Sequence, residues 1–104
     1  MCGSSNTNIA KALASTTGWH WGSDTCAVGN TPSSNNATGF GALPAGNRYD
    51  TYYEFGTAAY FWSATEYSST NAYRRRLYYS NAGVNRLNGD KGYGYSVRCV
   101  KDEN

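Results

Sequence analysis

The chain has 104 residues, of which 15% are charged and 15% aromatic, and its formal net charge is +2. This length suits a single domain with one modest core, and the charge is too small for the cationic surface that holds nucleic acid. No stretch approaches the roughly 20 apolar residues of a membrane-spanning helix. We therefore expect one domain over residues 1–104, with no transmembrane segment and no nucleic-acid partner.

The N-terminal part is predicted to contain one short helix, over residues 8–15. Ile9 and Leu13 lie four positions apart among alanines, so they share one face, and polar residues at 5–7 are available as N-caps. Residues 22–36 are rich in Gly, Ser, Asp, Thr and Asn with little periodicity, which predicts an irregular surface loop.

The three cysteines are an odd number, so at least one is unpaired. Cys2 and Cys26 flank a segment that can return on itself, and a disulfide between them would contribute about 3 kcal/mol by loop closure in an oxidising compartment. Cys99 lies in a strand-like run and is expected to be a buried free thiol that behaves as a small apolar residue. No spacing resembles a zinc or Cys-x-x-Cys site, and we expect no metal and no cofactor.

The remainder of the chain is predicted to form short strands. Residues 37–48 favour an extended segment that buries Phe40 and Leu43, and residues 49–56 are aromatic and turn-like. Residues 58–65 predict a central strand, followed by a polar connection at 66–71 and a hairpin around Asn81. Asn88-Gly89-Asp90 predicts a turn, and residues 94–101 a final strand. The fold class is α+β.

Strand alternation divides the hairpin around Asn81 into two faces. The face expected to be anchored in the fold carries Leu77, Tyr79, Val84 and Arg86. The face expected to be displayed carries Arg76, Tyr78, Ser80, Gly83, Asn85 and Leu87. Tyrosine gives a large contact area at low entropic cost, and Ser, Gly and Asn give adaptable hydrogen bonding. This mixture, without a catalytic pair, predicts recognition rather than catalysis.

Three blocks carry a resemblance to a known family: residues 39–46 (Gly-Phe-Gly-Ala-Leu-Pro-Ala-Gly), 61–66 (Phe-Trp-Ser-Ala-Thr-Glu) and 95–100 (Tyr-Ser-Val-Arg-Cys-Val). The chain resembles the Fibrobacter succinogenes major paralogous domain of bacterial surface and secreted proteins, which is related to the C-type-lectin-like and formylglycine-generating-enzyme folds. The resemblance implies a C-type-lectin-like domain with a short N-terminal helix, a small mostly antiparallel sheet and long irregular loops. It also implies an extracellular or cell-surface location within a larger surface protein. Because the family usually carries an upstream section with a further strand and helix, we expect the domain to be N-terminally incomplete here.

Residues 61–100 are also similar to the variable region of target proteins of diversity-generating retroelements. That resemblance implies that the changeable, ligand-binding positions are Tyr73, Arg76, Tyr78, Ser80, Gly83, Asn85, Leu87, Asn88, Gly89, Asp90, Gly92 and Tyr93. None of them is Lys, Glu, Gln, Met or Trp, the types that the mutated codons cannot encode. The constant frame would include Leu77, Tyr79, Val84, Arg86, Lys91, Gly94 and residues 96–99. Ordinary divergence between paralogues would give the same pattern.

The residues that carry out chemistry in proteins of related folds are mostly absent from this sequence. Calcium-dependent lectins need converging oxygens, including a Trp-Asn-Asp run, where this chain has Phe61-Trp62-Ser63. Formylglycine-generating enzymes need a reactive thiol pair with copper, and Cys99 has no cysteine near it in sequence. His20 is expected to be a half-buried or surface residue, and Glu66 to pair with Arg75, Arg86 or Arg98 inside the sheet.

We therefore expect a noncatalytic domain that binds a protein or glycan ligand. The alternatives are an enzyme related to the formylglycine-generating family and a passive structural surface module. A displayed Tyr and Arg patch favours binding, a buried polar cleft around Cys99 and His20 favours an enzyme, and burial of the Tyr78 face favours the structural role.

Overall fold

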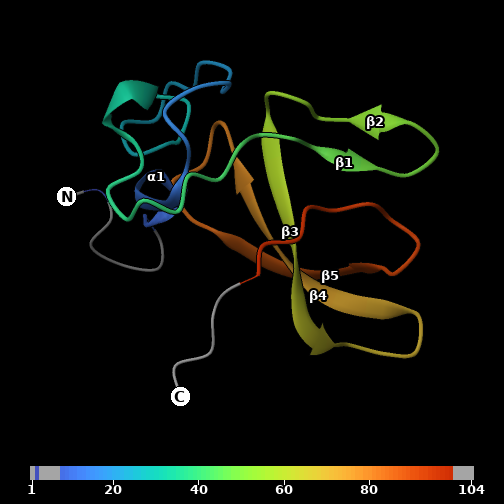
Figure 1. Ribbon diagram of the computed structural model, residues 1–104. Helices are drawn as coiled ribbons and strands as arrows, with labels where there is room; N and C mark the ends of the chain where they lie inside the picture. The colour runs from blue at the N-terminus through green and yellow to red at the C-terminus, as the bar shows by residue number, and fades with distance from the viewer. Residues whose placement is uncertain (1, 3–7, 100–104) are drawn as a thin grey trace.

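The computed structural model describes residue 2 and residues 8–99 (Figure 1). Its elements, in chain order, are α1 (Ala10–Leu13), the 3-10 helix η1 (Pro32–Ser34), β1 (Asn47–Arg48), β2 (Tyr52–Tyr53), β3 (Ala58–Glu66), β4 (Asn71–Tyr78) and β5 (Asn85–Asp90). The strands form two antiparallel sheets, β1-β2 and β3-β4-β5. The predicted α+β class, the short helix and the mostly antiparallel pairing are confirmed. None of the helices in the described part is long and apolar enough to cross a bilayer.

A single core joins α1, the loops that follow it and the three-stranded sheet. Its buried members are Ala10, Ala14, Trp19, Val28, Ala42, Ala59 and Leu77, and Leu13, Phe40, Phe61, Tyr79 and Val84 pack against them. The backbone N–H of Ala10 donates to the carbonyl of Ala82 at 2.9 Å, which fixes the start of α1 against the β4–β5 connection. The apolar edge of α1 packs against the sheet within this core. The polar residues at 5–7, expected as N-caps, lie outside the described residues.

The predicted surface loop at 22–36 is irregular apart from η1, and its expected superficial position is confirmed for most of the segment but wrong for part of it. Ala27 and Val28 are completely buried, and Asn35 is 7% exposed. Asn35 Nδ2 donates to the carbonyls of Ser15 (2.9 Å) and Val28 (3.0 Å). Its Oδ1 accepts from Lys11 Nζ at 2.8 Å. This amide replaces the missing regular hydrogen bonds, so a polar sequence without periodicity is held inside the fold.

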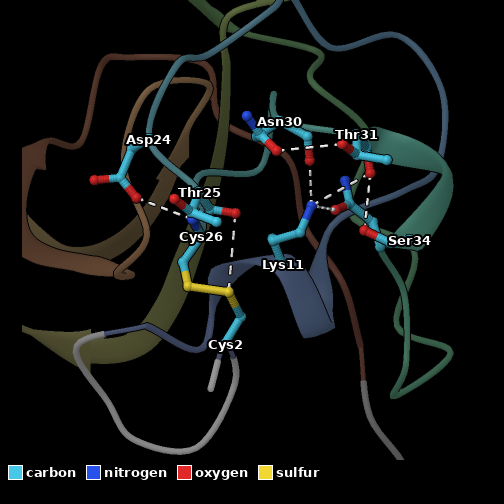
Figure 2. Close-up of a disulfide and its surroundings, with 9 residues drawn as sticks. Cys2, Lys11, Asp24, Thr25, Cys26, Asn30, Thr31 and Ser34 are labelled. Carbon is cyan, nitrogen blue, oxygen red and sulfur yellow. Dashed lines mark hydrogen bonds between the residues drawn. A yellow bond between two sulfur atoms is a disulfide. The ribbon is translucent and has the colours of Figure 1, made fainter.

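Lys11 joins the same network from α1. Its ammonium also donates to the carbonyls of Asn30 and Thr31, as Figure 2 shows. Burial lowers the pKa of Lys11 below its usual value. The helix is thereby attached to the irregular segment by charge-assisted hydrogen bonds, which are stronger than bonds between neutral groups.

A disulfide joins Cys2 to Cys26 and closes the loop that contains α1 (Figure 2). Cys99 is a free cysteine, and the expectation that it is buried is wrong because its side chain is exposed. The predicted final strand at 94–101 is also absent from the described part. Only isolated bridges occur there, between Gly94 and Arg48 and between Ser96 and Phe61. Because residues 94–99 form no continuous strand, Cys99 does not lie on the buried face of a sheet. Positions 100 and 101 lie outside the described residues.

The middle strand of the large sheet is β4, whereas the sequence predicted a central strand at 58–65. β3 instead has β4 on one edge and two isolated parallel bridges, to Gly46 and Ser96, on the other. These bridges cover the edge of β3 in places, which explains why a strand with β-formers on both faces lies at the side of its sheet.

The predicted turn at residues 88–90 is wrong, because these residues continue β5. Asn88, Gly89 and Asp90 pair with Tyr73, Ala72 and Asn71 of β4. The turn follows at 91–93, where the N–H of Tyr93 donates to the carbonyl of Asp90 at 3.0 Å. Cross-strand pairing therefore overrides the local turn preference of the Asn-Gly-Asp run.

Of the two apolar side chains expected to be buried in the extended segment, Phe40 is half-buried against the core and Leu43 is 59% exposed. The segment is extended, with an isolated bridge between Ala42 and Ala14, and only its last two residues belong to a sheet, as β1. Only the side that faces α1 is covered, so Leu43 points to solvent.

Candidate functional site

The register of the large sheet creates a face rich in Tyr and Arg. Directly opposed residues in antiparallel strands share a face. One row across the sheet is Tyr60, Arg76 and Asn85, and the next is Trp62, Arg74 and Leu87. We call these six residues, together with Tyr78, which pairs with Ala58, the tyrosine–arginine face. Leu77, Tyr79 and Val84 contact the core, as predicted for the anchored face of the hairpin. The prediction is wrong for Arg86, which lies on the same side of the sheet as Leu77 but is exposed.

Two arginines on this face stack on tyrosine rings. The guanidinium carbon of Arg74 lies 5.1 Å from the ring centroid of Tyr60, and that of Arg76 lies 4.8 Å from the centroid of Tyr78. Arg74 Nη1 also donates to Asn85 Oδ1 at 3.1 Å. Stacking on a ring favours a cation near the ring face and leaves the N–H edge of the guanidinium available for hydrogen bonding. The sheet thus holds two oriented guanidiniums among aromatic rings, of which Arg74 is buried and Arg76 is half-buried.

Tyr60 forms the buried floor of this face, and the half-buried Tyr95 covers it. Their rings stack at 5.0 Å with an interplanar angle of 12°, and Tyr95 also contacts Trp62 at 4.3 Å. Tyr60 Oη donates to Glu54 Oε2 at 2.5 Å. Burial, followed by this hydrogen bond, raises the pKa of Tyr60. Burial also raises the pKa of Tyr95.

We expect the alkaline titration of the protein to show tyrosines that ionise above the usual pKa of about 10. Both folded-state pKa values are raised, so their contribution to stability is complete below pH 10 and is lost as the pH rises further. The Tyr60→Phe/Tyr95→Phe variant should lose part of the late absorbance change at 295 nm in a pH titration. It should also show a shallower decline of unfolding free energy above pH 10. An unchanged late phase would contradict the burial of these two hydroxyls.

The tyrosine–arginine face is open only in part. Tyr60 and Arg74 are buried, whereas Arg76, Tyr78 and Asn85 are half-buried and Leu87 is 51% exposed. The chain after β5 covers one end, because the ring of Tyr95 lies over Gly89. A Cβ at Gly89 would come within 2.6 Å of the Tyr95 hydroxyl, so any larger residue at this position would force the Tyr95 ring to move. The accessible region is therefore the end of the sheet near the β4–β5 connection.

The twelve positions expected to form one ligand surface are distributed over several places. Arg76, Tyr78, Asn85 and Leu87 lie together on the tyrosine–arginine face, and Gly89 is buried on it under Tyr95. Tyr73, Asn88 and Asp90 lie on the opposite face, because the register pairs Tyr73 with Asn88 and Asn71 with Asp90. Gly92 and Tyr93 follow β5 in the turn. The expectation of a single face is therefore wrong for Tyr73, Asn88 and Asp90, since alternation continues unbroken through β5.

Ser80 and Gly83 lie in the connection between β4 and β5. Together with Asn85 and Asp24 they line a hollow of about 380 Å³. The hollow adjoins the accessible end of the tyrosine–arginine face through Asn85. Six of the twelve positions are therefore close along the chain and open to solvent at least in part: Arg76, Tyr78, Ser80, Gly83, Asn85 and Leu87.

Sequence reasoning missed the aromatic residues of the β1–β2 hairpin. Tyr49, Tyr52 and Phe55 are 62%, 73% and 80% exposed. The hairpin projects away from α1 (Figure 1), and the ring of Tyr49 contacts that of Tyr93 at 4.9 Å. The tyrosine-rich run at 49–53 is the sequence signal for this hairpin, although its composition also favours a turn. The hairpin extends the exposed aromatic area beyond the large sheet.

The ion pair predicted for Glu66 is wrong. Glu66 Oε2 accepts from Lys91 Nζ at 2.5 Å, near the surface, and no arginine takes part. The bulge between Trp62 and Glu66 shifts the end of β3 toward the turn that carries Lys91.

His20 is exposed, and its ring lies 6.3 Å from that of Tyr79. Among the described residues, no three His, Cys, Asp or Glu side chains lie close enough to hold a metal ion.

These features define a small α+β domain in which a mostly antiparallel sheet presents an aromatic and cationic face. The family model of the Fibrobacter succinogenes major domain matches residues 3–101, and the chain belongs to this family. Comparisons with curated proteins and with solved structures found no match.

Proposed function

We propose that this domain is a noncatalytic ligand-binding module of a bacterial or phage surface or secreted protein. The tyrosine–arginine face would contact a protein or a glycan. The observation that carries the proposal is the pair of rows across β3, β4 and β5, in which each arginine lies between an aromatic side chain and a side chain of β5.

The composition of these rows supports recognition. Tyr, Trp and Arg are the residues that most often dominate binding energy at interfaces. Arg76 and Tyr78 stack on each other and are half-buried, so little side-chain freedom remains to be lost on binding. The neighbouring hollow at Ser80 and Gly83 offers small polar groups that can adapt to a ligand.

We further infer that the domain has a C-type-lectin-like fold. A short helix, a small antiparallel sheet and long irregular segments held by hydrogen bonds support this inference. The free Cys99 and His20 are both exposed, so they do not form the buried polar cleft that an enzymatic role predicts.

The resemblance to retroelement target proteins gives a separate genetic prediction. If the displayed positions are diversified, a reverse transcriptase gene and a near-copy of the segment that encodes residues 61–100 should lie beside the gene. Sequencing of the neighbouring DNA tests this prediction, and absence of both features would contradict diversification without affecting ligand binding.

We expect the purified domain to bind members of a glycan array or of a displayed peptide library, and to lose that binding on substitution of the tyrosine–arginine face. Arg76→Ala and Tyr78→Ala should each weaken a selected ligand at least tenfold, equivalent to about 1.4 kcal/mol. Arg75→Ala is the matched control, because Arg75 is the next residue of β4 and lies on the other face. Binding is measured by biolayer interferometry, and folding by circular dichroism.

Two results would contradict the proposed function. The first is that neither panel yields a binder. The second is that Arg76→Ala and Tyr78→Ala bind as well as the wild type while Arg75→Ala does not.

A further inference from the structure

A second cavity lies on the core-facing side of the large sheet, opposite the tyrosine–arginine face. Its volume is about 570 Å³. Its floor is formed by apolar side chains of α1 and its N-cap, of the sheet, and of the β4–β5 connection: Ile9, Leu13, Phe61, Leu77 and Val84. Small-molecule sites typically have volumes of roughly 300–1,000 Å³ and are mostly apolar with a few polar groups. The cavity therefore has the size and the lining of a ligand site.

Three arginines form the polar part of this lining: Arg75, Arg86 and Arg98. Arg75 and Arg86 are direct cross-strand partners on β4 and β5, so two positive side chains lie opposite each other. The guanidinium of Arg86 lies 3.8 Å from the ring centroid of Tyr73, and that of Arg98 lies 4.4 Å from the centroid of Phe40. Ring contacts thus orient two of the three guanidiniums. We call this site the arginine-rimmed cavity.

None of these arginines has a carboxylate partner among the described residues. The sequence predicted that Glu66 would supply one, but Glu66 pairs with Lys91. Like charges placed directly opposite each other in an antiparallel pair destabilise the sheet, and no carboxylate in the described part of the chain compensates the repulsion between Arg75 and Arg86. An anion at the rim would relieve this repulsion, and the guanidinium fork matches carboxylate geometry with two parallel hydrogen bonds.

We propose that the arginine-rimmed cavity binds an amphipathic organic anion, with a carboxylate between the arginines and an aliphatic body against the apolar floor. The two halves of the lining specify this chemistry together. An uncharged apolar ligand would leave the cationic rim uncompensated, and a small hydrophilic anion would leave the floor unfilled. The cavity shares only Trp62 with the tyrosine–arginine face, and its three arginines are not members of that face, so the proposal does not depend on the function proposed above.

The test uses the full chain and three simple probes: octanoate, 1-octanol and acetate. Isothermal titration calorimetry at low salt should show saturable binding of octanoate. Binding of 1-octanol should be at least tenfold weaker, and binding of acetate should be undetectable. Higher salt should weaken octanoate binding, because the head group interacts with exposed charges.

Variants locate the site. Arg75→Gln/Arg86→Gln should weaken octanoate at least tenfold, and Arg98→Gln, outside the sheet, should weaken it independently of any change in strand pairing. The matched control is Arg76→Gln, at the neighbouring position of β4 on the opposite face. Its octanoate affinity should equal that of the wild type. Without ligand, Arg75→Gln/Arg86→Gln should melt at or above the wild-type temperature, because the opposed charges are removed.

Several results would overturn the proposal: no saturable binding of octanoate, equal binding of 1-octanol and octanoate, or equal weakening by Arg76→Gln and Arg75→Gln/Arg86→Gln. Asp102→Asn/Glu103→Gln removes two acidic residues of the chain itself and should leave the affinity unchanged. A tenfold gain in that variant would show that these residues compete for the arginines, and would overturn the assignment to an external ligand.

Discussion

Replacing Leu77 with alanine is expected to lower the free energy of unfolding by about 2 to 4 kcal/mol. Leu77 is 3% exposed and packs within the core cluster beside Ala59, its direct partner on β3. Removing three buried carbon atoms loses their transfer free energy and leaves space that the rigid sheet cannot fill. Urea denaturation with the disulfide intact measures the change.

Leu87→Ala is the control for this prediction. Leu87 lies on the neighbouring strand but on the tyrosine–arginine face, and is 51% exposed. Its truncation should change the free energy of unfolding by no more than about 0.5 kcal/mol. If both variants lose the same stability, the two faces of the sheet are not distinguished by burial, and the partition on which the proposed function depends is incorrect.

The second large effect is expected for Asn35→Ala, which should cost about 2 to 4 kcal/mol. The substitution removes two donors from the buried carbonyls of Ser15 and Val28 and one acceptor from the ammonium of Lys11. A buried group that loses its partner carries the full desolvation penalty, and this is larger for a charged group. Chemical denaturation and the exchange of amide hydrogens in residues 22–36 measure the effect.

Ser33→Ala, two residues earlier in η1, is the control for Asn35→Ala. Ser33 is exposed, so its removal should change stability by no more than about 0.5 kcal/mol. A loss confined to Asn35→Ala supports the interpretation that one side chain holds the irregular segment in place. Equal small losses in both variants would mean that backbone contacts are sufficient without the amide.

The residues of β4 that contact the core and those proposed to contact a ligand lie on opposite faces of the strand. β4 directs Arg75 and Leu77 to the core-facing side, and Arg74, Arg76 and Tyr78 to the other. Substitutions that test ligand binding can therefore be made at alternate positions without removing core packing. The same geometry makes Arg75 and Arg76 controls for each other in the two binding experiments.

Part of the site could be predicted from the sequence because it depends on the alternation of side chains along a strand. The separation of Leu77 and Val84 from Arg76, Tyr78 and Asn85 follows from counting residues around a turn. The prediction was wrong about the residue at which the second strand of the hairpin ends. The Asn-Gly-Asp run at 88–90 favours a turn locally, but pairing with β4 extends β5 through it.

Contacts between distant segments could not be predicted. Nothing near Glu66 in sequence indicates that Lys91 would be its partner, because the pairing depends on the bulge in β3 and on the position of the turn after β5. The burial of Asn35 likewise depends on an approach to α1 from 24 positions away. The cover of the tyrosine–arginine face by Tyr95 depends on a bridge between Ser96 and Phe61.

The sequence by itself determined the α+β class, the short helix at α1, the paired strands around Asn81 and the division of their side chains between two faces. These features follow from the local conformational preferences of neighbouring residues. Only the tertiary structure decided which arginines lie opposite one another, where Tyr95 covers the sheet and which side chains surround Lys11. Those contacts depend on strand register and loop closure, which bring together residues whose separation along the chain carries no information about their proximity.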